Sequence, residues 1–168
     1  TIGVVGAGQM GAGIAHVAAR TGLNVLLADM DLGRAEAGKI AVITRMEKSM
    51  ARKEQKGAEA SVLEAMAAEI IAIRERVQPV SGVDAMGEVQ IAIEAVTENE
   101  GLKDKIFAGL DAACSRDAIL ASNTSSIPIT RMASKLSNPE RFIGMHFMNP
   151  VPVMKLVEII RGLATSDE

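Results

Sequence analysis

A glycine pattern near the amino terminus constrains the fold of this 168-residue chain more than any other sequence feature. The pattern reads Gly6-Ala7-Gly8-Gln9-Met10-Gly11. It follows an apolar run at 2–5 and leads into residues 11–21, where apolar side chains recur at helical spacing. A second apolar run, 25–28, ends at Asp29. Strand, glycine turn, helix and strand in this order predict a βαβ unit with two parallel strands.

The rest of the sequence continues the alternation of helix and strand. Residues 34–56 and 59–75 are expected to form two helices that pair as a hairpin across Gly57. Further strands are expected at 90–96, 119–122, 142–147 and 155–160, and further helices at 102–114 and 128–136. The prediction is one α/β domain over 1–168. Its sheet is expected to be Rossmann-like, doubly wound and mainly parallel, with helices on both faces and an inserted helical hairpin at about 34–75.

Composition excludes several classes of protein. The chain has 18 basic and 21 acidic residues, and aromatic residues make up only 2%, which argues against a nucleic-acid partner. Cys114 is the single cysteine, so neither an intramolecular disulfide nor a cysteine zinc cluster can form, and no metal site is expected.

Targeting features are equally sparse. No apolar run reaches the roughly 18 residues of a membrane span, and nothing resembles a secretory signal. We therefore expect no membrane partner and a cytoplasmic location. The start at Thr1 rather than Met is also compatible with a trimmed mitochondrial targeting segment.

The glycine loop and Asp29 together predict an NAD site. Gly6 permits the tight turn, Gly8 lets backbone N–H groups approach a pyrophosphate, and Gly11 allows the helix to pack closely. The helix amino terminus adds partial positive charge. Asp29 follows at close to the usual spacing of about 20 residues. Its carboxylate would accept hydrogen bonds from a ribose diol and repel a 2′-phosphate, which favours NAD over NADP.

Two polar residues interrupt the last expected strands. His146 lies within Phe-Ile-Gly-Met-His-Phe-Met, and Glu158 lies within Lys-Leu-Val-Glu-Ile-Ile. A carboxylate in an apolar strand is costly unless it is paired or hydrogen-bonded. The two residues are on adjoining segments and could meet as a general acid–base dyad for hydride transfer at an alcohol carbon. The alternative is a histidine satisfied within the core, which is how we interpret His16, for which no acidic partner is evident.

Two further polar groups each allow two interpretations. Basic side chains line one side of the helix at 34–56, and they form either a solvated face or a platform for a polyanion such as coenzyme A. They are Arg45, Lys48, Arg52 and Lys56. The segment 123–126, Asn-Thr-Ser-Ser, follows an expected strand. Its hydroxyls either hydrogen-bond a substrate oxygen or cap the next helix.

With these residues in place, the sequence resembles the NAD-binding domain of the L-3-hydroxyacyl-CoA dehydrogenases, a family that includes 3-hydroxybutyryl-CoA dehydrogenases. The matching stretches are 6–15, 93–99, 120–126 and 144–160. The resemblance implies oxidation of the 3-hydroxyl group of an acyl-CoA to the 3-keto form, with hydride passed to NAD. It also implies roles for four residues near the reacting atoms: His146 as general base, Glu158 as its partner, Ser125 bonded to the substrate oxygen, and Asn149 shaping the His146 loop.

The same resemblance implies contacts with cofactor and substrate. The glycine loop (Gly6, Gly8, Gln9, Met10, Gly11) and Asp29 would hold the adenosine half of NAD. Glu98 and Lys103 match positions near the ribose and nicotinamide, and Asn123 falls in the same pocket. The helical hairpin corresponds to an arm that contacts coenzyme A, with Arg45, Lys48 and Arg52 as candidate contacts. Some family members have a small polar residue at the position of Arg45.

Members of this family continue into an all-helical C-terminal domain that supplies dimer contacts, part of the acyl pocket and a further active-site Asn. The present sequence ends at Glu168, where that domain would begin. We therefore expect a cofactor-binding fragment, poorly active alone, of a protein that forms a homodimer through that domain. Three alternatives stay open: a dehydrogenase for a non-CoA hydroxy acid, a domain of a multifunctional β-oxidation protein, and a nucleotide sensor without catalysis.

Overall fold

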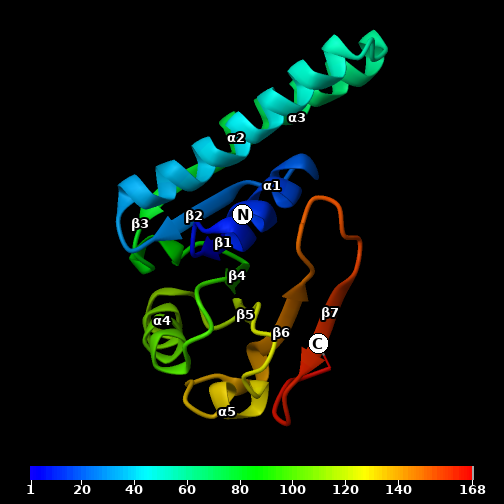
Figure 1. Ribbon diagram of the computed structural model, residues 1–168. Helices are drawn as coiled ribbons and strands as arrows, with labels where there is room; N and C mark the ends of the chain where they lie inside the picture. Colours follow the sequence, from blue (N-terminus) through cyan, green and yellow to red (C-terminus); the bar gives the residue numbers. More distant parts are fainter. Residues whose placement is uncertain (168) are drawn as a thin grey trace.

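Seven strands form one sheet in the order β3-β2-β1-β4-β5-β6-β7 in the computed structural model, which describes residues 1–167 (Figure 1). The strands are β1 Ile2–Val5, β2 Val25–Asp29, β3 Val77–Ser81, β4 Ile91–Glu94, β5 Ile119–Ser122, β6 Phe142–Phe147 and β7 Val157–Arg161. The helices are α1 Gln9–Arg20, α2 Leu32–Gln55, α3 Ala60–Arg76, α4 Glu100–Ala113 and α5 Ile129–Ala133. Short 3₁₀ turns lie at Asp84–Met86 and Pro139–Arg141.

The first six strands are parallel, and only β7 runs antiparallel to its neighbour β6. The strand order changes direction between β1 and β4, because β2 and β3 lie on one side of β1 and the later strands on the other. Ligands of such sheets bind at the carboxyl ends of the strands near this change of direction. The predicted α/β, mainly parallel, Rossmann-like fold is therefore confirmed.

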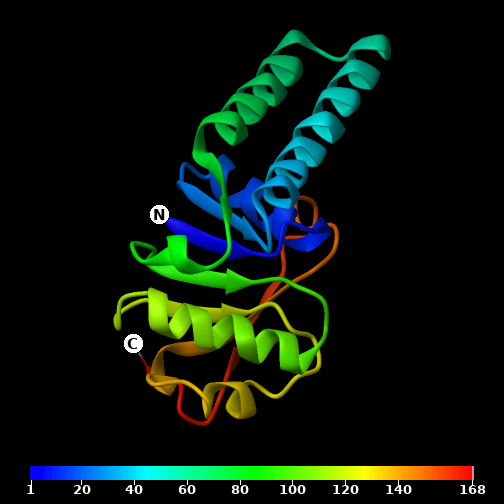
Figure 2. The same cartoon turned by 90° about the vertical axis from the view of Figure 1, so that its left-hand side faces the viewer.

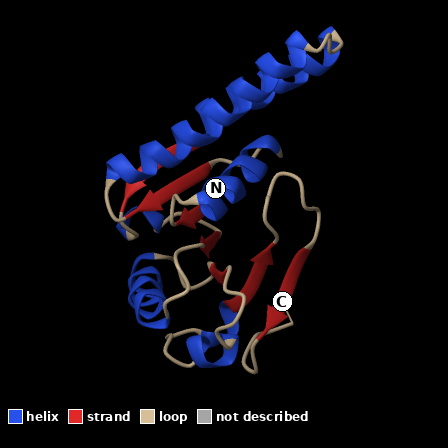
Figure 3. Ribbon diagram, in the orientation of Figure 1, coloured by secondary structure: helices blue, strands red, loops and turns tan. Residues whose placement is uncertain are grey.

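Helices cover both faces of the sheet, so its interior strands are apolar on both sides (Figure 3). One core lies under α1, α2 and α3 and contains Val4, Ile14 and Leu27. The other lies under α4 and α5, where the rings of Phe107 and Phe142 meet edge to face with centroids 4.8 Å apart. Strand β7 differs, because most of its residues are exposed.

The sequence analysis missed strand β3. Helix α3 passes directly into this strand, which contains Pro79 and has no fully apolar run. Proline is tolerated there because β3 is the outermost strand on its side of the sheet. Several other bounds differ from expectation by one to three residues. For example, β4 ends at Glu94 rather than at 96, and α5 ends at Ala133 rather than at 136.

Helices α2 and α3 form the expected hairpin, which projects beyond the sheet (Figures 1 and 2). Its base is fixed by Lys39, whose Nζ donates to the carbonyl oxygens of Arg74 at 2.8 Å and Val77 at 2.7 Å. Buried His16 of α1 lies below the hairpin, with Nε2 3.4 Å from Glu69 Oε2 of α3. The expectation that His16 lacks an acidic partner was therefore wrong, because the hairpin folds back over α1. Burial lowers the pKa of His16.

Within residues 1–167, no helix combines the length and apolar character needed to cross a membrane.

Candidate active site

The glycine loop joins β1 to α1 at the carboxyl edge of the sheet. Gly6 has a φ of 101°, a conformation that favours glycine. A Cβ on Gly11 would lie 1.7 Å from the Gly6 carbonyl oxygen, so helix and loop pack in contact only without a side chain there. A Cβ on Gly8 would meet nothing within 4 Å, which leaves the backbone open to a ligand on that side.

Asp29 ends β2 beside this loop. Its Oδ2 accepts a hydrogen bond from the Ala7 amide at 2.7 Å, and its Oδ1 accepts one from the Met30 amide at 2.8 Å. Asp29, Gly8, Gln9 and Arg45 are among the residues around an open pocket of about 430 Å³ between the loop and the base of α2. An approachable glycine backbone, a helix amino terminus and a carboxylate in one pocket fit the adenosine half of NAD.

His146 and Glu158 meet across the antiparallel pair of strands β6 and β7. They are directly opposite in register, and His146 Nδ1 lies 2.7 Å from Glu158 Oε2. The histidine side chain is 23% exposed and the glutamate side chain 50%. The structure therefore brings the predicted dyad together. Because Glu158 occupies Nδ1, the Nε2 atom is the ring nitrogen left for another partner.

Glu98 holds the turn at 122–126, which we call the serine turn. Its Oε1 accepts from the hydroxyl of Thr124, the amide of Ser125 at 3.1 Å, and the amide and hydroxyl of Ser126 at 3.2 and 2.9 Å. Burial alone would raise the pKa of Glu98, but the hydrogen bonds from Thr124 and Ser126 and the nearby Lys103 ammonium lower it to about 2. Glu98 is therefore an anion at neutral pH.

The hydroxyls of the serine turn differ in their contacts. Thr124 Oγ1 accepts the Ile127 amide at 3.0 Å, which is a local turn contact. Ser125 is exposed, so its hydroxyl is accessible. Asn123 Oδ1 accepts the Phe147 amide at 2.8 Å and so ties the turn to the end of β6, next to His146.

Lys103 lies beneath the site rather than open to it. Its side chain is 1% exposed, and its Nζ donates to Glu94 Oε1 at 2.6 Å and lies 3.4 Å from Glu98 Oε2. In this structure the lysine, which we predicted to bind cofactor, touches carboxylates of the chain itself. Because Lys103 is buried, it has no direct access to a ligand. Its connection to the site is its contact with Glu98.

Asn149 links the two halves of the site. Its Oδ1 accepts from Gln9 Nε2 at 2.9 Å, which joins the glycine loop to the loop after His146. Val151 of the same loop packs on α1, where a Cβ on Gly13 would lie 3.0 Å from the Val151 Cβ. Lys48 and Arg52 do not join this group. Both are exposed on α2 and, unlike Arg45, do not line the pocket.

The sequence analysis gave no site role to Glu94 or Ser122. Both contribute hydrogen bonds to the polar cluster, in which Thr124 and Ser126 also take part. Glu94 carried a visible signal, because it is the one charged residue that interrupts the apolar run at 90–96. Among residues 1–167 no group of three or more His, Cys, Asp or Glu side chains is placed to hold a metal ion.

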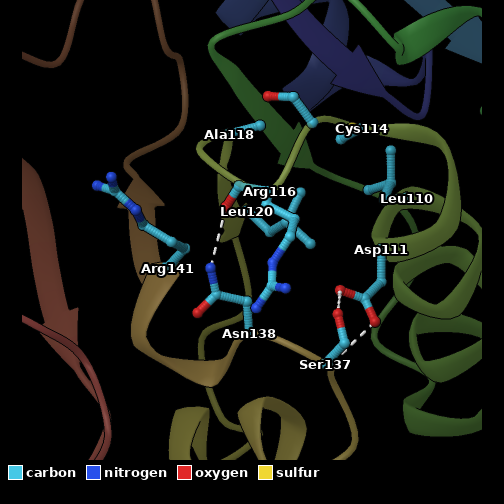
Figure 4. A pocket seen from close by; sticks show the side chains of 10 residues that line it. Leu110, Asp111, Cys114, Arg116, Ala118, Leu120, Ser137, Asn138 and Arg141 are labelled. Atoms are coloured by element: carbon cyan, nitrogen blue, oxygen red, sulfur yellow. Dashed lines mark hydrogen bonds between the residues drawn. The ribbon is translucent and has the colours of Figure 1, made fainter.

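A second cavity lies at the opposite, amino ends of β5 and β6 (Figure 4). It encloses about 20 Å³, enough for roughly one water molecule and far too small for a cofactor. Ser137 donates to Asp111 there, with an Oγ–Oδ1 distance of 2.8 Å, and Cys114 lines the wall. Burial raises the pKa of the Cys114 thiol, which favours the neutral form.

Comparison with known proteins agrees with this geometry. The family model described as "3-hydroxyacyl-CoA dehydrogenase, NAD binding domain" matches residues 1–168. A probable 3-hydroxybutyryl-CoA dehydrogenase of Bacillus subtilis is 46% identical over 98% of this chain and 54% of its own length. A fatty acid oxidation complex subunit alpha of Idiomarina loihiensis is 42% identical over all of this chain and 22% of its own length.

A crystal structure of (S)-3-hydroxybutyryl-CoA dehydrogenase from Ralstonia eutropha superimposes with a TM-score of 0.84 and 43% identity. The superposition covers 99% of this chain and 55% of the Ralstonia eutropha chain. The chain thus spans about half the length of the 3-hydroxybutyryl-CoA dehydrogenases it resembles. The family match covers the glycine loop, the serine turn and the His146–Glu158 pair, so this chain belongs to the family of 3-hydroxyacyl-CoA dehydrogenase NAD-binding domains.

Proposed function

We propose that this protein catalyses the NAD-dependent oxidation of L-3-hydroxyacyl-CoA, such as 3-hydroxybutyryl-CoA, to 3-ketoacyl-CoA. The observation that carries the proposal is the 2.7 Å contact between His146 Nδ1 and Glu158 Oε2, at the same sheet edge as the glycine loop. Asn149 joins these two parts through its bond to Gln9. A positioned base beside a dinucleotide site is the arrangement that oxidation of an alcohol needs.

The acid–base chemistry belongs to His146. With Nδ1–H donating to Glu158, Nε2 accepts the proton of the substrate 3-hydroxyl, and the carboxylate stabilises the imidazolium that forms. NAD held at the glycine loop would supply the acceptor for the hydride from carbon 3. The exposed hydroxyl of Ser125 donates a hydrogen bond to the substrate oxygen, and Asn149 shapes the His146 loop.

The cofactor contacts are distributed over the carboxyl edge of the sheet. Amides of the glycine loop (Gly6, Gly8, Gln9, Met10, Gly11) would hold the pyrophosphate, and Asp29 would hold the adenosine ribose. Glu98 and Asn123 would border the nicotinamide half. Lys103 acts on that half through its 3.4 Å contact with Glu98.

The basic side of α2 provides contacts for the coenzyme A part of the substrate. Arg45 lines the pocket, and Lys48 and Arg52 are exposed on the same helix. Guanidinium and ammonium groups attract phosphates. From the sequence, this stripe could be either a solvated face or a phosphate platform. The position of Arg45 beside the nucleotide pocket supports a contact with a phosphate group.

The test is NADH oxidation by the full-length protein with acetoacetyl-CoA, followed by loss of NADH absorbance. Free acetoacetate serves as the matched control, because it carries the same keto group without coenzyme A. We expect turnover with the CoA ester alone. Equal turnover with both compounds would indicate a non-CoA hydroxy acid as substrate. NADH binding without turnover of either compound would contradict the proposal and favour a nucleotide sensor.

A further inference from the structure

We propose that Glu94 is a positioning residue, which holds the serine turn, and therefore Ser125, in place for hydride transfer. This inference rests on the proposed function. It concerns a carboxylate that is 0% exposed at the end of β4, the strand beside β1 where the sheet changes direction. The acid–base chemistry of His146 gives this carboxylate no role.

Glu94 belongs to a closed ring of contacts that is buried except at Glu98, whose side chain is 38% exposed, and that we call the buried ring. Lys103 Nζ donates to Glu94 Oε1 at 2.6 Å, and Ser122 Oγ donates to Glu94 Oε2 at 2.7 Å. Ser122 Oγ in turn accepts the Thr124 amide at 3.2 Å. Thr124 donates its hydroxyl to Glu98 Oε1, and Glu98 Oε2 lies 3.4 Å from Lys103 Nζ, which closes the ring.

The buried ring acts on Ser125 through Glu98. The oxygen of Glu98 that accepts from Thr124 also accepts the Ser125 amide at 3.1 Å. The Ser125 backbone is thus tied to Glu98, and Glu98 is tied to Glu94 by Lys103 on one side and by Thr124 and Ser122 on the other. The Ser125 side chain stays exposed. The ring therefore fixes where the hydroxyl is presented.

Stability alone does not account for a pair of charges at this depth. A buried ion pair is costly to desolvate, and replacing one with apolar residues is often neutral or stabilising. The pair instead fixes the position of the backbone at Val96, because both partners contact the segment there, which leads to the site. Glu94 Oε1 accepts the Val96 amide at 2.7 Å, and Lys103 Nζ donates to the Val96 carbonyl at 3.4 Å.

The chemistry at position 94 calls for a group that only accepts. Glu94 receives hydrogen bonds from an ammonium, an amide and a hydroxyl, and a carboxylate accepts all three without offering a donor. A carboxamide has nearly the same shape, but it has no charge to match the Lys103 ammonium, and its NH₂ group would make Ser122 Oγ accept rather than donate. Glu94→Gln thus weakens the buried ring at Lys103 and at Ser122 and leaves its volume nearly unchanged.

The experiment compares Glu94→Gln and Ser122→Ala with Ser137→Ala. Ser122→Ala removes the hydroxyl between Glu94 and the Thr124 amide and leaves the Lys103–Glu94 pair in place. Ser137→Ala is the matched control, because it removes a hydroxyl bonded to Asp111 at the opposite end of the sheet (Figure 4). The full-length proteins are assayed with NADH and acetoacetyl-CoA, and kcat is normalised to the number of NADH-binding sites. Amide hydrogen exchange of residues 124–126 is measured in parallel.

We expect kcat per NADH-binding site to fall on the order of tenfold in Glu94→Gln and in Ser122→Ala. The KM for acetoacetyl-CoA should change less than kcat. Exchange at residues 124–126 should accelerate in both variants, and Ser137→Ala should match the unmodified protein in every measurement. If Glu94→Gln does not fold, Ser122→Ala carries the test by itself.

The inference is overturned if kcat per NADH-binding site and amide exchange are unchanged in the variants that fold. It is also overturned if the loss of rate disappears on normalisation, because that result shows a loss of folded protein only. Absence of acetoacetyl-CoA turnover in the unmodified protein would instead reject the proposed function. Amide exchange at residues 124–126 would then test, independently of activity, whether the buried ring holds the serine turn in place.

Discussion

Two glutamates of the site have similar contacts in opposite surroundings. At the centre of the sheet, Glu94 lies 2.6 Å from Lys103, and these side chains are 0% and 1% exposed. At the outer edge, Glu158 lies 2.7 Å from His146, with 50% and 23% exposure. A buried pair resists any change in charge, whereas a pair open to solvent can exchange protons. The comparison supports the proposals that the central pair holds position and that the edge pair performs the chemistry.

The largest effect is expected for the pair at the outer edge of the sheet, His146 and Glu158. His146→Gln removes the proposed general base, and we expect kcat with acetoacetyl-CoA to fall by about 10²- to 10⁴-fold. The dissociation constant for NADH should stay the same, because the glycine loop and Asp29 lie elsewhere. Steady-state kinetics and NADH fluorescence titration measure the two quantities. Retention of most of the activity would remove His146 from the acid–base role.

The next largest effect is expected for the pair at the centre of the sheet, Lys103 and Glu94. Lys103→Met leaves the Glu94 carboxylate buried without its cation, and we expect the free energy of unfolding to drop by about 3–5 kcal/mol. Glu158→Gln is the matched variant at the edge, where exposure limits the change to about 1 kcal/mol or less. Denaturant titrations provide both values. Equal losses of unfolding free energy in the two variants would contradict the proposed difference between the two pairs.

A smaller effect is expected at the nucleotide pocket. Asp29→Ala removes a charged acceptor proposed to bind the ribose, which is worth about 1.5–3 kcal/mol, or roughly 10- to 100-fold in NADH affinity. NADPH should lose less, because the repulsion of its 2′-phosphate is removed as well. Titration with both nucleotides gives the ratio of affinities. An unchanged ratio would argue against Asp29 as the residue that selects NAD.

The smallest effect concerns Glu98, which links the central pair to the serine turn. Its folded-state pKa of about 2 lies below the ordinary value of 4.5, so the ionised form contributes stability above pH 4.5. This contribution is lost as the pH falls to about 2. In Glu98→Gln the unfolding free energy should therefore fall less steeply over this range than in the unmodified protein. Parallel slopes in denaturant titrations would show that Glu98 has no such role.

Local sequence signals were sufficient wherever a short segment determines the structure. The glycine loop, Asp29 and the alternation of helices and strands predicted the fold, because glycine turns and buried parallel strands have strong local patterns. Strand β3 was missed because Pro79 interrupts it and only its edge position makes that tolerable. The contact of His146 with Glu158 was predictable because two adjoining polar interruptions share one expected pair of strands.

Contacts between distant segments were harder to predict. The partner of His16 was missed because Glu69 reaches it only when the hairpin folds back over α1. The burial of Lys103 was also missed, since a lysine on a surface-like helix gives no sign that a buried glutamate lies beneath it. Glu94 itself was visible as a charge in an apolar run, but its partners on β5 and α4 depend on the packing of the sheet.

The most direct test of the dyad is a double-mutant cycle of His146→Gln and Glu158→Gln, measured as kcat for NADH oxidation with acetoacetyl-CoA. If Glu158 acts through His146, Glu158→Gln should lower kcat by about 10- to 100-fold in the unmodified protein. It should then have no further effect in the His146→Gln background. An equal fall in both backgrounds would show that the two residues act independently, and it would contradict the assignment of His146 and Glu158 to one acid–base dyad.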